Sequence, residues 1–299
     1  MSKSFVALAA AIAATTVTSL TGGARLVAPA RADAPPRLTA TVFTGSPAGF
    51  LVDSTLVTGD KDAILIDAQF DLADAHHLVA AILDSKKNLT TVYITHFHPD
   101  HYFGLGVIQQ AFPNAKLVAL PAAVDEIKRT WQDKVKQWAP LYGDLVPTRP
   151  VLPVALAGKT LTLEGQTLEI HGGVQGDAED NSYVWIPSIK TVVAGDIIYR
   201  GVHAWTRETN PAQRKAWRKT LDQLAALAPV VVIAGHKDPQ LKDDAGAIEA
   251  TRGYLDVFDA AVATSKTSAE VQRKVKAKYP EAQLDIILQL GADAAFPAK

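Results

Sequence analysis

Three histidines and an aspartate fall within six consecutive positions of the segment THFHPDHYFG, residues 95–104. Histidines two apart in an extended segment project to similar sides, so His96 and His98 can offer their imidazoles to one metal ion. Asp100 and His101 follow at the expected start of a helix and point to a neighbouring position. The spacing therefore predicts a centre for two metal ions. A histidine-rich surface loop or a hydrogen-bonded core cluster is the alternative.

The composition restricts the chemistry of such a centre. The 299-residue chain contains no cysteine, so any metal site must use nitrogen and oxygen ligands, and thiol chemistry is excluded. The net charge is −1 and the basic residues are spread along the chain, which gives no electrostatic footprint for nucleic acid or an anionic membrane. We therefore expect a small-molecule substrate, no nucleic-acid partner and no stable membrane association.

The N-terminal residues 1–32 have the features of a cleaved signal peptide. Lys3 gives a positive start, residues 5–14 form an apolar run, and Ala30-Arg31-Ala32 offers the pattern of small residues that precedes cleavage. A membrane anchor is the alternative, but the run is much shorter than the roughly 20 residues that span a bilayer. We expect a periplasmic or secreted protein in which residues 33–299 form a single domain.

The order of the expected elements indicates the fold class. A β-branched strand at 91–95 leads into the histidine segment, and Pro140 is expected to end a helix that begins at residue 124. Strands followed by helices recur in both halves of the chain, which predicts an α/β fold packed as a four-layer αβ/βα sandwich. The expected strands are 51–58, 63–66, 91–95, 117–120, several short ones between 151 and 194, and 230–234; the expected helices are 71–83, 102–112, 124–138, 211–227 and segments from 245 onwards.

The sequence resembles the metallo-β-lactamase-fold hydrolases over roughly residues 41–239, because four separate segments match that family in the same order. THFHPDH after an internal strand is the signature of that family. AGD at 194–196 is similar to the strand end that carries a bridging aspartate, and AGH at 234–236 is similar to the final histidine. LVTGDKDAILID at 56–67 is similar to the first hairpin, whose terminal aspartate, here Asp67, supports the histidine loop from behind the ligands.

The resemblance implies a set of ligands for two divalent metal ions, with zinc as the first expectation. Asp196 would bridge the ions. Asp100 would also steer the attacking water and return a proton to the leaving group. The implied ligands are His96, His98 and a third residue for the first ion, and Asp100, His101 and His236 for the second.

The third ligand of the first ion departs from the family pattern. The family usually has a histidine in a GHTxxN or GHTxxS segment, whereas this chain has GDAEDNSYVWIP at 176–187, which puts Asp177 in that place. Three alternatives stay open: Asp177 is the ligand, His171 moves in from six residues upstream, or the first metal site is weak or empty. An added carboxylate lowers the Lewis acidity of the site and favours harder ions, so we expect weaker zinc binding there, with Mn or Fe as competitors.

The predicted activity is hydrolysis by a metal-bound hydroxide of an ester, a lactone, a β-lactam or a similar carbonyl compound. In the fold implied by the resemblance, the loop after Asp196 lies beside the metals, so His203, Trp205 and Arg207 are candidates for the substrate pocket. Ordinary packing or surface exposure is the alternative for each. Trp131 and Trp138, seven positions apart on an expected helix, are interpreted as a stripe that faces the core or anchors a lid.

Two other functions compete with hydrolysis. One is a mononuclear iron enzyme of the sulfur dioxygenase type, which the oxygen-rich ligand set permits. The other is a non-catalytic exported binding protein whose metal site has degenerated. One iron per chain with oxygen consumption would favour the dioxygenase, two zinc ions with ester turnover would favour the hydrolase, and one metal ion with no turnover would favour the binding protein.

Overall fold

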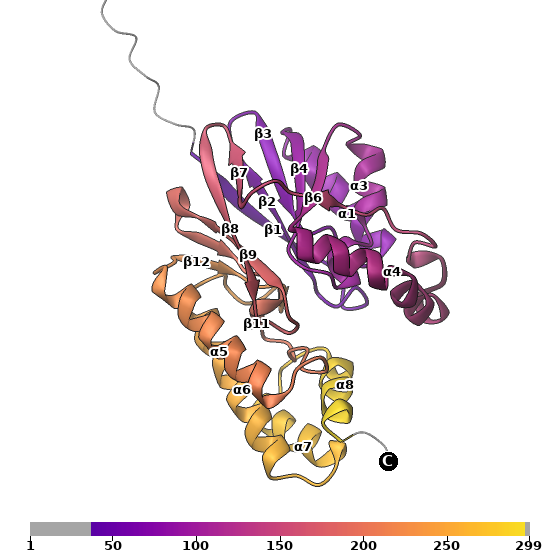
Figure 1. Cartoon of the computed structure of the whole chain (residues 1–299), viewed down its shortest axis with the longest axis vertical. Coiled ribbons are helices and arrows are strands. Elements are labelled where there is room, and N and C mark those ends of the chain that lie inside the picture. Colours follow the sequence, from indigo (N-terminus) through magenta and orange to yellow (C-terminus); the bar gives the residue numbers. More distant parts are fainter. Residues whose placement is uncertain (1–36, 297–299) are drawn as a thin grey trace, which may run out of the picture. The chain divides into compact units, whose positions relative to one another are not determined.

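The computed structural model describes residues 37–296, which belong to one compact unit (Figure 1). The predicted signal peptide, residues 1–32, lies outside the described residues. Within residues 37–296, no helix is both long enough and apolar enough to cross a membrane.

The N-terminal half forms a six-stranded sheet in sequence order. Its first three strands are antiparallel, and from β3 onwards neighbouring strands run parallel. β2 is buried at every position because both faces of the sheet are covered. The strands are β1 (Thr39–Thr44), β2 (Asp53–Thr58), β3 (Asp62–Ile66), β4 (Asn88–Ile94), β5 (Lys116–Ala119) and β6 (Val154–Ala155).

The second half forms a five-stranded sheet in the order β12-β10-β9-β8-β7, in which only the β10–β12 pair is parallel. A short parallel pair, β11 and β13, continues beyond β10 and β12. The strands are β7 (Thr160–Leu163), β8 (Gln166–Val174), β9 (Asn181–Ile186), β10 (Thr191–Val193), β11 (Tyr199–Arg200), β12 (Val231–Ile233) and β13 (His236–Lys237).

The helices cover the two outer faces (Figure 1). The first sheet packs on α1 (Leu72–Asp84), α3 (Leu105–Ala111) and α4 (Pro121–Tyr142), and the second on α5 (Pro211–Ala226) and α6 (Gly246–Ala263). The C-terminal helices α7 (Ser268–Lys278) and α8 (Asp285–Ala295) extend the second group. A third apolar cluster joins the sheets, because Ile66 and Tyr93 of one sheet pack with Val184 and Ile186 of the other. The predicted four-layer αβ/βα sandwich is confirmed.

Two helix predictions were wrong in detail. α4 continues through Pro140 to Tyr142, because a proline in the last turn removes only one hydrogen bond close to where the helix ends anyway. The helix expected at 102–112 is divided into α2 (Pro99–Tyr102) and α3. The division occurs at Gly104, where an added Cβ would come within 1.9 Å of the carbonyl oxygen of Ala68, so the chain packs there against the end of β3.

Candidate metal centre

The histidine loop follows β4 directly and is fixed by a residue that follows the neighbouring strand. β3 and β4 are parallel, so their carboxyl ends meet at the same edge of the sheet. Asp67, directly after β3, accepts hydrogen bonds of 2.9 Å from the backbone nitrogen and from Oγ1 of Thr95. Its Oδ2 lies 2.8 Å from Nδ1 of His101. Asp67 therefore both positions the loop and orients one of its imidazoles.

The first group of candidate ligands combines the histidine loop with two later segments. Its members are His96, His98, Asp177 and Asp196, whose donor atoms all lie within 4.8 Å of one another. Nδ1 of His98 is 3.0 Å from Oδ2 of Asp177, and Nε2 of His96 is 3.5 Å from Oδ2 of Asp196. All four residues are buried.

The second group consists of Asp100, His101, Asp196 and His236, again with donor atoms within 4.8 Å. Nε2 of His101 is 3.1 Å from Oδ1 of Asp196, and Nε2 of His236 is 3.3 Å from both Asp100 and Asp196. Nδ1 of His236 donates a hydrogen bond of 2.7 Å to the carbonyl oxygen of Phe50. Because a carbonyl only accepts, Nδ1 carries the proton and Nε2 is free to bind a metal.

Among the described residues, Asp196 alone belongs to both groups. It follows β10 at a position where the backbone comes very close to the segment before β13. Gly235 is required there, because an added Cβ would come within 2.1 Å of Oδ1 of Asp196. The AGD and AGH segments thus end parallel strands side by side and bring Asp196 and His236 together.

The buried polar atoms of the centre fit divalent metal ions. Nε2 of His96, Nε2 of His101 and Oδ1 of Asp196 are buried and have no hydrogen-bond partner among the described residues. Such atoms are costly unless a ligand satisfies them. Burial alone would raise the pKa of Asp196, but the imidazoles of His236, His101 and His96 hold it well below its usual range. An ionised carboxylate between unpaired imidazole nitrogens is a suitable environment for a cation such as zinc.

Asp177, and not His171, lies beside the other candidate ligands. Asp177 is fully buried, and its two oxygens lie 3.1 Å from Nδ2 of Asn181 and 3.1 Å from the hydroxyl of Tyr199. Burial raises the pKa of Asp177, and His98 opposes this rise. His171 belongs to neither group: its side chain is 38% exposed and stacks on Tyr183 with ring centroids 4.7 Å apart.

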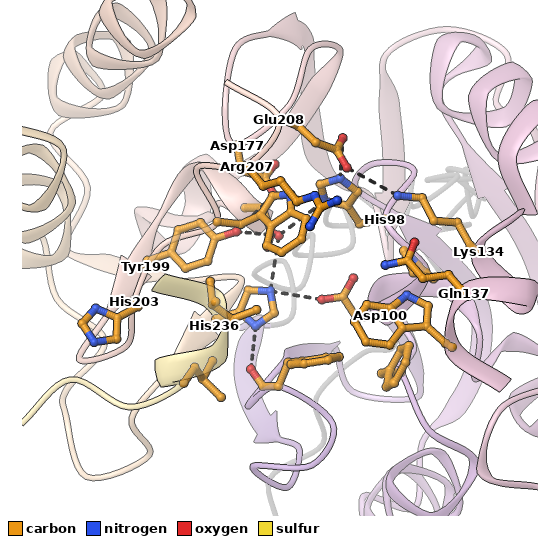
Figure 2. A pocket seen from close by; sticks show the side chains of 18 residues that line it. His98, Asp100, Lys134, Gln137, Asp177, Tyr199, His203, Arg207, Glu208 and His236 are labelled. Atoms are coloured by element: carbon orange, nitrogen blue, oxygen red, sulfur yellow. Dashed lines mark hydrogen bonds and ion pairs between the residues drawn. The ribbon is translucent and has the colours of Figure 1, made fainter. Parts of the chain in front are cut away.

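A cavity of about 230 Å³ opens onto the ligands, several of which line it. Figure 2 shows the side chains of Asp100, Asp177 and Tyr199 directed towards His98 and His236. The other walls combine polar and apolar side chains, and the apolar ones come from at least four separate regions of the chain. They include Phe50, Phe70, Trp138, Trp205, Leu284 and Ile287.

The three predicted pocket residues line this cavity but differ in what they present to it. The ring of Trp205 lies 6.3 Å from that of His98. Arg207 is exposed and has no ion-pair partner among the described residues. His203 is buried, Nδ1 of its ring lies 3.1 Å from the hydroxyl of Tyr254, and its imidazole points away from the ligands (Figure 2). Trp138 packs on the core as expected and also lines the cavity.

The sequence analysis missed three residues that contact the ligands or their partners. Tyr199 is buried, and its hydroxyl lies 2.8 Å from Asp196 and 3.1 Å from Asp177. Its position three residues after Asp196 could have suggested it. Glu208 contacts His98, and Lys134 contacts Glu208. No local pattern links these two, because they are 74 positions apart.

Comparisons with known proteins agree with the fold. Residues 47–236 match the family model of the metallo-beta-lactamase superfamily. The chain belongs to this superfamily. Over 190 residues, 61% of this chain and 68% of the relative, it is 26% identical to a type 2 metallo-beta-lactamase of Bacteroides fragilis.

Two solved structures share the fold. A metallo-beta-lactamase family protein of Thermus thermophilus has a TM-score of 0.61 at 20% identity, with 87% of this chain and 91% of that chain covered. A metallo-beta-lactamase from Pontibacter korlensis has a TM-score of 0.53 at 19% identity, with 74% and 95% covered.

Proposed function

We propose that this protein is an exported hydrolase that uses two divalent metal ions to cleave an ester, a lactone, a β-lactam or a similar carbonyl compound. Superfamily membership supports metal-dependent hydrolysis in general. The observation that carries the finer proposal is the pair of ligand groups joined by Asp196. Zinc is the metal to test first, with Mn and Fe as competitors at the group that contains Asp177.

Bound metal ions would make a water molecule more acidic and would polarise the carbonyl of the substrate. Asp100 is the residue placed to move the proton. Its side chain is 14% exposed at the cavity, whereas those of Asp177 and Asp196 are at most 2% exposed. Its Oδ2 is 3.3 Å from Nε2 of His236. A carboxylate in this position can accept a proton from water and pass it to a leaving group in the cavity.

The cavity walls indicate the kind of molecule that binds. Apolar and aromatic side chains would bury an apolar part of the substrate next to the scissile bond. Arg207, exposed and without an acidic partner among the described residues, would attract an anionic group. β-Lactams, which carry a carboxylate, and lactones with apolar substituents are therefore the first classes to test. The relative from Bacteroides fragilis is named as a metallo-beta-lactamase, which makes the first class a natural starting point.

The test is hydrolysis of a panel of esters, lactones, β-lactams and thioesters by the full chain loaded with zinc. We expect turnover of at least one class, which is lost on chelation and is absent in Asp196→Asn. Turnover that survives both chelation and this substitution would contradict the proposal.

The iron enzyme remains the second candidate because of the first ligand group. Two imidazoles with carboxylates are a ligand set that non-haem iron also uses. One iron per chain and consumption of oxygen would favour this function. One metal per chain with no turnover of any kind would favour a binding protein.

A further inference from the structure

His98 has a carboxylate partner on the side of its ring that faces away from Asp177. Nδ1 of His98 lies 3.0 Å from Asp177, and Nε2 lies 3.3 Å from Oε2 of Glu208. Both partners are carboxylates, which accept hydrogen bonds, so when Nδ1 and Asp177 hold a metal ion together the ring proton lies on Nε2 and is donated to Glu208. Nδ1 then carries no proton on the side of the first ligand group.

Glu208 is itself held by a lysine from the other half of the sandwich. Nζ of Lys134, on α4, lies 3.5 Å from Oε1 of Glu208 (Figure 2). The same ammonium group lies 5.9 Å from the ring centroid of Phe97, which stands between His96 and His98 in the chain. The side chain of Lys134 is only 17% exposed. Lys134 therefore contacts both the histidine loop and the loop that carries Glu208.

The other imidazoles of the centre show what such a partner does. Nδ1 of His101 is oriented by Asp67, and Nδ1 of His236 by the carbonyl of Phe50. Partners of this kind fix the tautomer and the ring orientation of a ligand, and a carboxylate partner also increases its basicity. Glu208 stands in the same relation to His98 as Asp67 does to His101.

We propose that Glu208 is a positioning residue for the first metal site, and that Lys134 keeps its carboxylate against His98. The inference rests on the metal-binding part of the proposed function. It does not depend on which substrate is cleaved. Because Trp205, Arg207 and Glu208 lie on one loop, the same segment shapes the cavity wall and supports the first site.

The test is a zinc titration of the full chain in competition with a chromophoric chelator, which resolves two binding steps. In Glu208→Ala we expect about a 10–100-fold loss of affinity at one step and no change at the other. Glu208→Gln keeps the shape and an acceptor oxygen but loses the charge, so its loss should be smaller. Lys134→Met, which keeps the length of the side chain, should have the smallest effect of the three.

The matched control is Glu179→Gln, because the Glu179 carboxylate accepts a hydrogen bond from Gln213 and contacts none of the candidate ligands. This variant should bind both ions as the wild type does. The absorption spectrum of the cobalt-loaded protein should change in Glu208→Ala and stay unchanged in Glu179→Gln. A purely structural role of Glu208 would leave the spectrum unchanged.

Two results would overturn the inference. One is binding of both ions by both Glu208 variants within twofold of the wild type. The other is an equal loss at both steps together with a lower melting temperature of the metal-free protein. Neither result depends on hydrolysis. A chain that cleaves no substrate but shows the selective loss would contradict the proposed activity and keep the role of Glu208.

Discussion

The two ligand groups have the same composition but different support. With Asp177 in place of a histidine, each group has two imidazoles, one carboxylate of its own and a share of Asp196. In the second group, His101 contacts the carboxylate of Asp67, whose side chain is 2% exposed, and His236 contacts the backbone carbonyl of Phe50. Behind His98 of the first group stands Glu208, whose side chain is 32% exposed. The residues behind the ligands, more than the ligands themselves, distinguish the two sites.

This comparison predicts an order of metal affinity. Hydrogen bonds to buried partners persist because water does not compete for them, whereas a partly exposed glutamate is screened by solvent. The second site should therefore hold its ion more tightly than the first. The four predictions that follow test the comparison, starting with the largest expected effect.

Asp196→Asn should disable both sites together, because Asp196 is the residue that they share. The amide keeps the size of the side chain but removes the charge that attracts the two ions. We expect the metal content to fall at both steps, and any hydrolytic activity to fall by about 10³-fold or more, since a metal pair supplies several kcal/mol. Elemental analysis and steady-state rates measure this. Loss of only one ion would show that the sites are independent.

Asp67→Asn should weaken the second site more than the first. The amide cannot accept from Nδ1 of His101 and from Thr95 as the carboxylate does, so His101 loses the partner that orients it. We expect about a 10–100-fold loss of affinity at the tighter step of a chelator titration. Asp60→Asn, at an exposed position, is the control. A loss confined to the weaker step would reverse the assignment of the two sites.

Asp177→His should make the first site more like that of relatives that carry a histidine there. Zinc affinity at the weaker step should rise and the ability of Mn to compete should fall, because a neutral imidazole replaces an anionic oxygen donor. Competition titrations with zinc and manganese measure both. Unchanged affinity together with unchanged metal preference would count against Asp177 as a ligand.

His203 lies on the same loop as Glu208 and should make the stability of the fold decrease in mild acid. Burial lowers the pKa of His203 from 6.5 to about 4. As the pH falls from about 6.5 to about 4, the unfolded chain therefore binds a proton that the folded chain does not, and stability decreases. The melting temperature of the wild type should fall between pH 7.5 and pH 5. In His203→Asn this fall should be a few degrees smaller, as thermal unfolding at the two pH values will measure.

The exposed His76 provides the control for this effect. His76→Asn should keep the pH dependence of the wild type. The same pH dependence in His203→Asn would contradict a buried neutral His203.

The fold class and the seven candidate ligands could be predicted from the sequence, because each depends on a pattern in a short segment. The histidine segment is contiguous, and Asp196 and His236 each lie three residues after the end of a short β-branched strand. Asp177 was placed through its neighbour Asn181, and the structure shows the two side chains 3.1 Å apart. Local patterns of this kind can be recognised in the sequence without knowledge of the tertiary structure.

The features that the sequence did not indicate arise from contacts between distant segments. Lys134 and Glu208 meet only because α4 and the loop after β11 face the same cavity. Leu284 and Ile287 reach the cavity from the C-terminal region, which lies beyond the part of the chain that resembles the family. Pro140 led to a helix end that was predicted too early. The energetic cost of a proline depends on its distance from the end of the helix, and the sequence does not give that distance.

The most direct test of the account is the metal content of the chain purified from the organism that makes it, combined with anomalous diffraction to locate each ion. The account predicts two divalent ions per chain on either side of Asp196, one beside Asp177 and one beside His236. A single ion per chain, or ions bound away from Asp196, would contradict it.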